Sequence, residues 1–285
     1  MGKTGLVVEG GGMKCAYGAG ILDKFIDDGI SFDYCIGVSA GSANTASFVA
    51  GQRGRNIRFY TDYIDDPQYF GARSFLKTGD LFGLKYIYGD LTNAGGRDPI
   101  DYDAIMANPA EFEIAATDAE TGKPVYFHKE EMIRDNYCHI MASCAIPAAC
   151  RPVKFGGHVY YDGGVSDSIP AQRAIDSGCE RIVFILSKAR GFIRKPQKPR
   201  LIYSIMCCRY PEIVKDLNSR HIVYNNQREL VFSLEKEGRA FVFAPSDPAE
   251  ISTFNMKRDT EWQLYDLGIK DYEAVQGDFL EFMGK

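Results

Sequence analysis

The sequence has few of the residues from which metal sites and disulfide frameworks are built. Its 285 residues include only four histidines and eight cysteines, and the cysteines form no CxxC pair and show no regular spacing. A zinc site and a disulfide-stapled fold are therefore not indicated. The pattern is that of reduced thiols in a cytosol, and it predicts a protein without a metal ion or another cofactor.

Long apolar runs and a strong excess of one charge are also absent. No segment approaches the roughly 18 consecutive apolar residues of a membrane span, and no apolar stretch near the first residues has the length of a signal peptide. We therefore expect a cytoplasmic protein whose contact with membranes, if it makes any, is peripheral. The 33 basic and 38 acidic residues give a formal net charge of −5, so a nucleic-acid partner is not expected.

The apolar patterns alternate between those of strands and those of helices. Residues 6–9 and 34–38 are predicted strands, and residues 13–28 and 42–50 are predicted helices. Such alternation predicts a three-layer α/β/α fold with a mainly parallel central sheet. Further along we expect strands over residues 111–116, 125–128, 158–161, 181–186 and 241–243, and helices over residues 132–145, 171–177, 212–236 and 272–282. No repeat or linker marks a boundary, so residues 1–285 are predicted to form a single domain.

A glycine-flanked serine lies where the second predicted strand meets a helix. Residues Gly37-Val38-Ser39-Ala40-Gly41 match G-x-S-x-G, the pattern of a nucleophile turn. On such a turn the Ser39 side chain is pushed out of the sheet. The N–H of Ala40 then lies at a helix N-terminus, where it can stabilise developing negative charge. The other interpretation is a glycine-rich turn with an incidental serine.

Three consecutive glycines follow the first predicted strand. Gly10, Gly11 and Gly12 expose successive N–H groups, which suits an oxyanion or a phosphate. A dinucleotide fingerprint is disfavoured because Cys15 stands in place of its third glycine, and a Walker loop is excluded because no Gly-Lys-Ser/Thr follows. We therefore expect an oxyanion hole that faces the serine turn. Lys14 either fixes this loop, adds positive potential or is an exposed lysine at the start of a helix.

The serine needs a base, and the histidines are poorly placed for that role. None lies on an evident loop at the carboxyl edge of the sheet; they are His128, His139, His158 and His221. Asp162 instead ends an apolar, aromatic strand and is followed by Gly163 and Gly164, a turn that lets another backbone come close. A carboxylate in a partly dry cleft can accept the serine proton directly. The alternative for this Asp-Gly-Gly segment is a tight turn without a catalytic role.

Taken together, three separated segments resemble the patatin-like phospholipase family. They are Gly10 to Lys14, Gly37 to Gly41 and Asp162 to Gly164, in the order and approximate spacing of the family. The resemblance covers roughly residues 5–190. Residues 200–285 are predicted to be a helical C-terminal portion of the same domain and are assigned no chemistry.

The resemblance implies an α/β/α fold and a Ser39–Asp162 dyad without histidine. It also implies an oxyanion hole that draws its N–H donors from Gly11, Gly12 and Ala40. Cys15 departs from the family, which usually has glycine after the basic residue. A crowded first helical turn at this position would narrow the hole.

These features predict a serine hydrolase of lipid acyl esters, of the phospholipase A or lysophospholipase type. Apolar side chains between residues 69 and 88 either line a channel for the acyl chain or belong to the core. Residues 181–211 carry eight Lys or Arg and no acid, so they either bind an anionic headgroup or membrane or form a solvated loop. Two alternatives are a soluble short-chain esterase or thioesterase with the same dyad, and a non-catalytic nucleotide- or lipid-binding module.

Overall fold

A computed structural model describes residues 2–247 and 256–285 of the chain. Within these ranges one sheet contains the strands β1 (Thr4–Val8), β2 (Tyr34–Val38), β3 (Glu111–Asp118), β4 (Pro124–His128), β5 (Val153–Phe155), β6 (His158–Asp162), β7 (Arg181–Ile185) and β8 (Ala240–Phe243). The strand order is β5-β6-β3-β2-β1-β7-β8, and β4 pairs with β3. The strands from β3 to β8 in this order are parallel, whereas β4, β5 and β6 join through antiparallel pairs.

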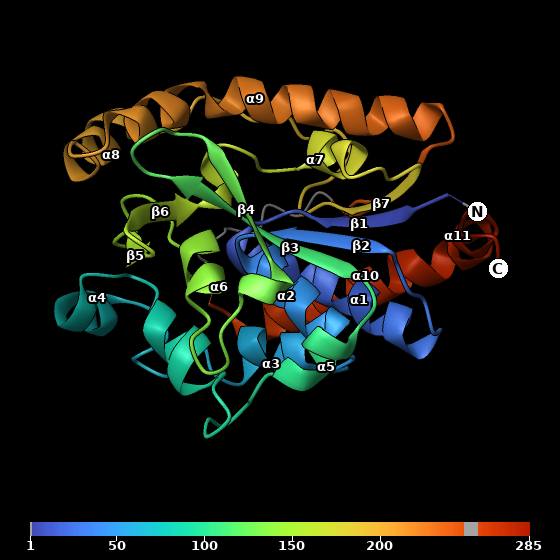
Figure 1. Ribbon diagram of the computed structural model, residues 1–285, viewed down its shortest axis with the longest axis horizontal. Helices are drawn as coiled ribbons and strands as arrows, with labels where there is room; N and C mark the ends of the chain where they lie inside the picture. The colour runs from blue at the N-terminus through green and yellow to red at the C-terminus, as the bar shows by residue number, and fades with distance from the viewer. Residues whose placement is uncertain (1, 248–255) are drawn as a thin grey trace.

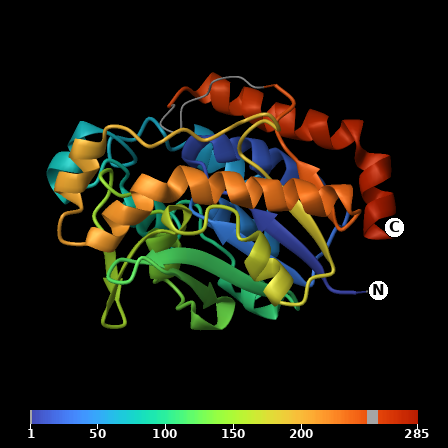
Figure 2. The same ribbon diagram turned by 90° about the horizontal axis from the view of Figure 1, so that it is seen from above.

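Helices cover both faces of the sheet (Figure 1). The α-helices are α1 (Ala16–Asp27), α2 (Ala40–Val49), α3 (Arg55–Thr61), α4 (Ala72–Thr78), α5 (Tyr102–Ala107), α6 (Cys138–Ser143), α7 (Ala171–Asp176), α8 (Arg200–Met206), α9 (Pro211–Lys236), α10 (Arg258–Ala274) and α11 (Gln276–Met283). On one face lie α1, α2 and α10, and on the other lie α7 and α9 (Figures 1 and 2). The predicted three-layer α/β/α fold is therefore confirmed.

Both faces of the parallel strands are buried, as expected for a sheet that carries helices on each side. In β1, the side chains of Leu6 and Val8 belong to one core and that of Val7 belongs to the other. In β7, Val183 and Phe184 are divided between the two cores in the same way. Successive side chains of a strand point to opposite faces, so nearly continuous apolar runs fill both cores.

The C-terminal part of the chain is mainly helical and packs on both faces (Figure 2). On one face α9 lies beside β8, and on the other α10 lies along α1. Two hydrogen bonds from tyrosine hydroxyls join α1 and α10. Tyr265 donates to Asp23 at 2.7 Å, and Tyr17 donates to Asp271 at 3.0 Å. No helix of the described residues is long and apolar enough to cross a membrane.

Three predicted helical segments differ from those in the structure. The helix expected over residues 132–145 is only α6, because the chain turns just before it: Asp135 has a φ of 60° and accepts a hydrogen bond from the N–H of Ala94 at 2.6 Å. Such side chain to backbone contacts compete with helix formation. The helix expected from Met13 begins as a 3-10 turn, η1 (Gly12–Cys15), before α1. The helical segment expected over residues 272–282 is divided between α10, which begins already at Arg258, and α11. The short elements β5, α3, α4 and α5 have no counterpart in the prediction.

Candidate active site

The sheet brings the serine turn, the glycine loop and Asp162 together. Parallel β1 and β2 end at the same edge, with Val8 paired to Gly37, so the loops that follow them are neighbours. Strand β6 runs antiparallel to β3 and returns toward that edge, with Asp162 opposite Ala116. Since Ala115 pairs with Val38 of β2, the last residue of β6 reaches the level of the serine.

Ser39 stands on a strained turn between β2 and α2. Its φ is 54° and its ψ is −134°, a region that residues with a side chain rarely occupy. The hydroxyl Oγ donates to Asp162 Oδ2 at 2.6 Å, and the backbone N–H donates to Ser143 Oγ at 2.8 Å. The Ser42 hydroxyl donates to the Ser39 carbonyl oxygen at 2.7 Å. These bonds fix the serine with its hydroxyl aimed at the carboxylate.

Asp162 is buried, with 4% of its surface exposed. Its second carboxylate oxygen, Oδ1, accepts the N–H of Gly164 at 2.7 Å, so the carboxylate cannot swing away from the serine without losing that bond. Burial raises the pKa of the Asp162 carboxyl above its ordinary value, and the nearby Arg220 guanidinium opposes the shift. The result is a dry carboxylate whose affinity for a proton is increased.

The glycine loop passes directly against the serine. A Cβ on Gly10 would lie 2.8 Å from Ser39 Cβ, closer than real Cβ atoms approach one another. The N–H groups of Gly11 and Gly12 donate to no backbone acceptor of the described chain. Ala40 is the first residue of α2, so its N–H has no acceptor within the helix. These three donors are free to bind an oxygen that carries negative charge.

The residues that follow the glycines are packed inward. Cys15 is buried, and its Sγ lies 3.5 Å from the Glu9 carbonyl oxygen. The first helical turn is tight at this point, because η1 is a 3-10 turn. Lys14 is half-buried and close enough to Lys188 to lower the pKa of that side chain. Of the interpretations for Lys14, a positive potential at the loop fits this position, and an exposed lysine does not.

The other motif glycines allow close backbone approaches. A Cβ on Gly41 would lie 2.6 Å from the Val8 carbonyl oxygen, which would push α2 away from β1. A Cβ on Gly163 would lie 2.3 Å from the Ala115 carbonyl oxygen, and Gly37 is similarly confined by the first turn of α2. Because glycine has no Cβ, the backbone at the serine turn and at the Asp162 turn can lie this close to the backbone of the neighbouring strands.

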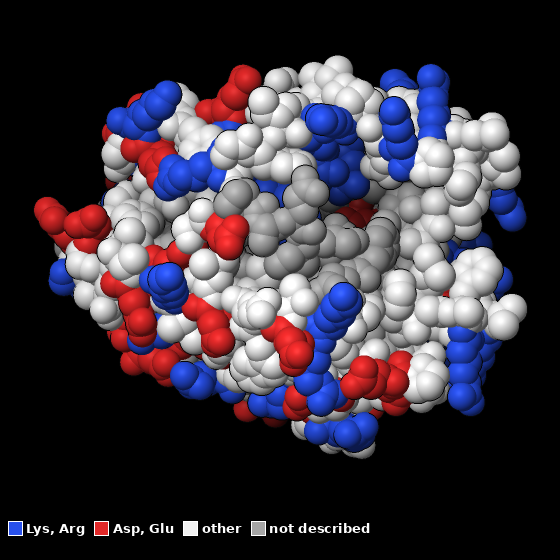
Figure 3. Space-filling model, turned by 180° about the vertical axis from the view of Figure 1, so that it is seen from behind, with Lys and Arg blue, Asp and Glu red and all other residues white. Residues whose placement is uncertain are grey.

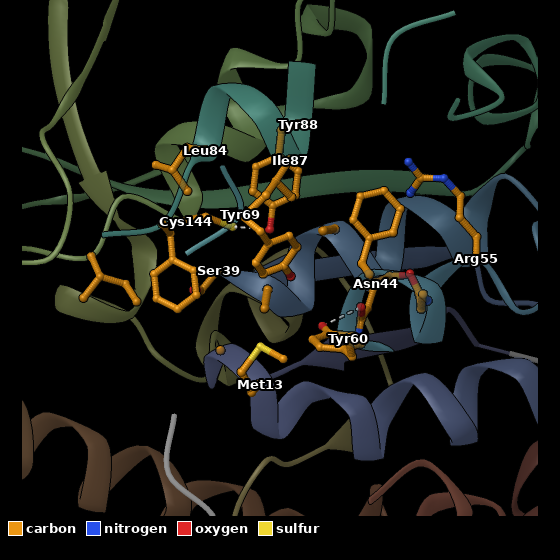
Figure 4. A pocket seen from close by; sticks show the side chains of 17 residues that line it. Met13, Ser39, Asn44, Arg55, Tyr60, Tyr69, Leu84, Ile87, Tyr88 and Cys144 are labelled. Carbon is orange, nitrogen blue, oxygen red and sulfur yellow. Dashed lines mark hydrogen bonds between the residues drawn. The ribbon is translucent and has the colours of Figure 1, made fainter. Parts of the chain in front are cut away.

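An apolar pocket opens beside Ser39 (Figure 4). Several of its lining side chains come from the segment between residues 69 and 88, namely Tyr69, Phe82, Leu84, Ile87 and Tyr88. Tyr69, Phe82, Leu84 and Ile87 are therefore both buried and part of the pocket wall, and Tyr88 is half-buried in it. Phe75 and Leu76 on α4 are instead exposed. Asn44 and Tyr60 share a hydrogen bond of 2.9 Å within the wall. The pocket is suited to an apolar chain attached to a group at the serine.

Ser143 and Arg220 lie at the site but were given no role from the sequence, whereas Arg194 belongs to the basic stretch over residues 181–211. Ser143 orients the Ser39 backbone and also donates to the Ala115 carbonyl oxygen at 2.6 Å. Ser143 lies on α6, which begins 99 residues after Ser39, so no local sequence pattern connects the two residues. Arg194 and Arg220 border the pocket that contains Asp162. No histidine lines either of the two pockets that include Ser39.

Comparison with known proteins defines the class of this protein. A family model described as patatin-like phospholipase matches residues 6–175. The chain therefore belongs to the patatin-like phospholipase family, a family of lipid acyl hydrolases. A second model, described only as a domain of unknown function (DUF6363), matches residues 210–284.

Among individual proteins, this chain is similar to the uncharacterized protein YjjU of Escherichia coli strain K12. The two are 29% identical over 202 residues, which cover 69% of this chain and 55% of YjjU. The chain thus spans about half the length of this curated relative. A comparison with solved structures finds VipD from Legionella pneumophila, with a TM-score of 0.48 and 12% identity, over 96% of this chain and 67% of VipD.

Proposed function

We propose that this protein is a serine lipid acyl hydrolase in which Ser39 is the nucleophile and Asp162 is the base. The observation that carries the proposal is the 2.6 Å hydrogen bond from Ser39 Oγ to the buried Asp162 carboxylate. A serine hydroxyl is a weak nucleophile until a neighbouring base takes its proton. The raised pKa of Asp162 makes it a better proton acceptor than an exposed aspartate.

In the first half of the reaction, Ser39 Oγ attacks the ester carbonyl carbon while its proton moves to Asp162. The carbonyl oxygen becomes an oxyanion, which the N–H groups of Gly11, Gly12 and Ala40 stabilise. As the intermediate collapses, the bond to the alcohol breaks and Asp162 returns the proton to the leaving alcohol oxygen. The acyl group stays on Ser39 as an ester.

In the second half, a water molecule attacks the acyl-enzyme and gives its proton to Asp162. A second oxyanion forms at the same N–H donors and collapses with release of the fatty acid. Ser39 Oγ leaves and recovers the proton from Asp162, so the dyad ends in its starting state.

A lipid is the substrate that the surroundings of Ser39 favour. The pocket beside the serine is lined by aromatic and aliphatic side chains, and burying a methylene group there contributes about 0.8 kcal/mol. The short acyl chain of an esterase or thioesterase substrate would gain little binding free energy from this apolar lining. Activity on a series of esters that differ only in acyl length separates the two: we expect kcat/KM to rise with chain length, and a maximum at two to four carbons would favour the esterase.

Contact with an anionic lipid surface is part of the proposal. Helices α4 and α8 lie at the same end of the molecule (Figures 1 and 2), and both expose apolar side chains there, with Leu76 85% and Leu201 72% exposed. Lys195 and Lys198 lie just before α8. Apolar side chains that are fringed by basic ones favour the interface of an anionic membrane.

This contact is tested by pelleting with anionic phospholipid vesicles. Changing Leu201 and Ile205 together to Ser should weaken pelleting at least about tenfold, because two apolar anchors are lost. The Ser39→Ala variant is the matched control and should pellet like the wild type. Unchanged pelleting of the α8 variant would show that this surface does not bind lipid.

The nucleophile is tested by intact mass after treatment with a fluorophosphonate probe. We expect one adduct on the wild type and none on Ser39→Ala, because the probe reacts with an activated serine whatever the natural substrate is. No adduct on correctly folded wild type, together with stabilisation by nucleotides in a thermal shift assay, would favour the non-catalytic alternative. Circular dichroism of the wild type and of Ser39→Ala establishes that both proteins are folded.

A further inference from the structure

A second pocket meets the first at Ser39, and its wall is cationic. It extends from the glycine loop and Asp162 to the loop before α8 and to α9. Its basic lining residues are Lys188, Arg194, Lys195, Lys198 and Arg220. On the face shown in Figure 3, Lys and Arg side chains gather beside a hollow near the middle of the molecule.

The carboxylates of this pocket are already saturated by neutral donors. Glu9 accepts the N–H of Ser187 at 2.7 Å on one oxygen and the hydroxyl of Tyr224 at 2.7 Å on the other. Asp162 likewise accepts from a serine hydroxyl and a backbone N–H. Two acids with neutral partners therefore face Arg194, Lys195, Lys198 and Arg220, together with Lys188, whose pKa burial lowers to about 7. The basic side chains outnumber the acids, so the pocket carries an uncompensated positive charge.

The two arginines are held in place but lack anionic partners. No carboxylate of the described residues lies within the 4.0 Å of an ion pair from Arg194 or Arg220, and the Nε atoms of both are buried without a hydrogen-bond acceptor. Arg194 stacks on the ring of Tyr224 at 4.3 Å, and its backbone N–H donates to Asn225 Oδ1 at 2.9 Å. Both side chains are half-buried, and among the described residues the side-chain acceptor of Arg220 is the neutral Gln197 Oε1, 3.5 Å from one of its terminal nitrogens. Buried donor nitrogens that lack an acceptor are costly unless a ligand supplies one.

Arg220 lies close to Asp162, the proposed base. A Cβ on Gly164 would lie 2.8 Å from an Arg220 terminal nitrogen and 3.0 Å from Asp162 Oδ1, so the guanidinium borders the turn that holds the base. Burial, the larger cause, and the neighbouring Arg194 lower the pKa of Arg220 to about 10. Both residues lie outside the segment matched by the patatin-like model, and Arg220 is on α9, within the domain of unknown function.

We infer that Arg194 and Arg220 form an anion subsite that binds a phosphate on the alcohol side of the acyl ester. The inference rests on the proposed function, and it assigns a specificity role to α9. With the ester carbonyl at Ser39, the acyl chain occupies the apolar pocket and the alcohol extends into the cationic one. A guanidinium fork matches the oxygens of a carboxylate or of a phosphate. Phosphate is the anion that we assign, because it offers more oxygens and more negative charge than a carboxylate to two guanidinium groups at one pocket.

The test measures binding to the Ser39→Ala protein, so that it does not depend on hydrolysis. The ligands are 1-acylglycerol 3-phosphate and 1-acylglycerol with the same acyl chain, both below their critical micelle concentrations, by isothermal titration calorimetry. We expect the phosphate compound to bind about 10- to 100-fold more tightly, the range of a charge-assisted hydrogen bond. Replacing Arg194 or Arg220 by Met in the same background should remove most of this ratio. Lys215→Met, which alters an exposed lysine of α9, should retain it.

Each other outcome has a definite meaning. Equal binding of the two lipids, or a ratio that both arginine variants retain, would overturn the subsite. If inorganic phosphate alone binds as tightly as the phosphorylated lipid, the pocket is a site for free phosphate and the substrate assignment is overturned. Failure of the proposed function is separate, since it would appear as wild-type protein without a fluorophosphonate adduct while the binding ratio persists.

Discussion

Replacing Asp162 by Asn is expected to lower activity and stabilise the fold at the same time. The Asn side chain has nearly the same shape, and its oxygen can still accept the N–H of Gly164, which now bonds to Asp162 Oδ1 at 2.7 Å. Its amide nitrogen, however, would donate to Ser39 Oγ, so the hydrogen bond would no longer prepare the hydroxyl to lose its proton. Loss of a general base lowers kcat about 10²- to 10⁴-fold, which corresponds to about 3–5 kcal/mol of barrier.

The effect on stability follows from the pKa of Asp162. Because burial raises its pKa in the folded state above that of the unfolded chain, the ionised carboxylate destabilises the folded protein near neutral pH. Stability is therefore regained as the pH falls through the folded-state pKa, where the carboxyl takes up a proton. The Asn substitution removes this penalty, so the Tm near neutral pH should be equal to or above that of the wild type. The difference should vanish in acid.

Two measurements on the same samples check this prediction. Single-turnover hydrolysis of a chromogenic acyl ester gives the chemical step, and differential scanning calorimetry at several pH values gives the Tm. A variant that keeps wild-type activity would refute the role of Asp162 as base. A variant with a markedly lower Tm at neutral pH would mean that Asp162 mainly holds its turn together, which is the alternative interpretation of the Asp-Gly-Gly segment.

Two further predictions concern the surroundings of the dyad. Ser143→Ala leaves the buried N–H of Ser39 without its acceptor, so we expect a loss of about 1–3 kcal/mol in urea denaturation together with a lower kcat; unchanged values of both would exclude a positioning role. Burial, with Lys14 and Arg194 as neighbouring cations and Glu9 opposing them, lowers the pKa of Lys188 to about 7. Lys188 therefore loses its charge as the pH rises through about 7, and KM for a phosphate-bearing ester should rise there. The Lys188→Arg variant should not show this rise of KM with pH. If the rise persists in the variant, it comes from the titration of another group.

The residues of the proposed dyad could be selected from sequence because each is marked by its own local pattern. Ser39 and Asp162 each come directly after a predicted strand, and each is followed by a segment that contains glycine. Parallel neighbouring strands place their ends at one edge of a sheet, so the glycine loop and the serine turn had to be neighbours. The position of Asp162 depended on more, because β6 reaches that edge only through its antiparallel pairing with β3, which the local pattern did not determine.

The supporting residues were not predictable because their roles depend on contacts between distant segments. Ser143 lies on a helix predicted to be much longer, and the turn that shortens this helix is fixed by the contact between Asp135 and Ala94. The basic stretch over residues 181–211 was found, but its charge alone did not separate a solvated loop from a binding surface. That distinction required α9, which supplies Arg220 and the Tyr224 ring on which Arg194 stacks.

The same helix joins the C-terminal part of the chain to the glycine loop. Tyr224 of α9 donates to Glu9, which precedes the glycines, and Glu9 also accepts the N–H of Ser187 after β7. The Ser187 hydroxyl in turn donates to the Gly10 carbonyl oxygen at 2.9 Å. Loss of α9 would therefore leave a buried carboxylate short of a hydrogen bond directly beneath the loop. A helix matched only by a domain of unknown function thus supports the geometry on which the proposed oxyanion hole depends.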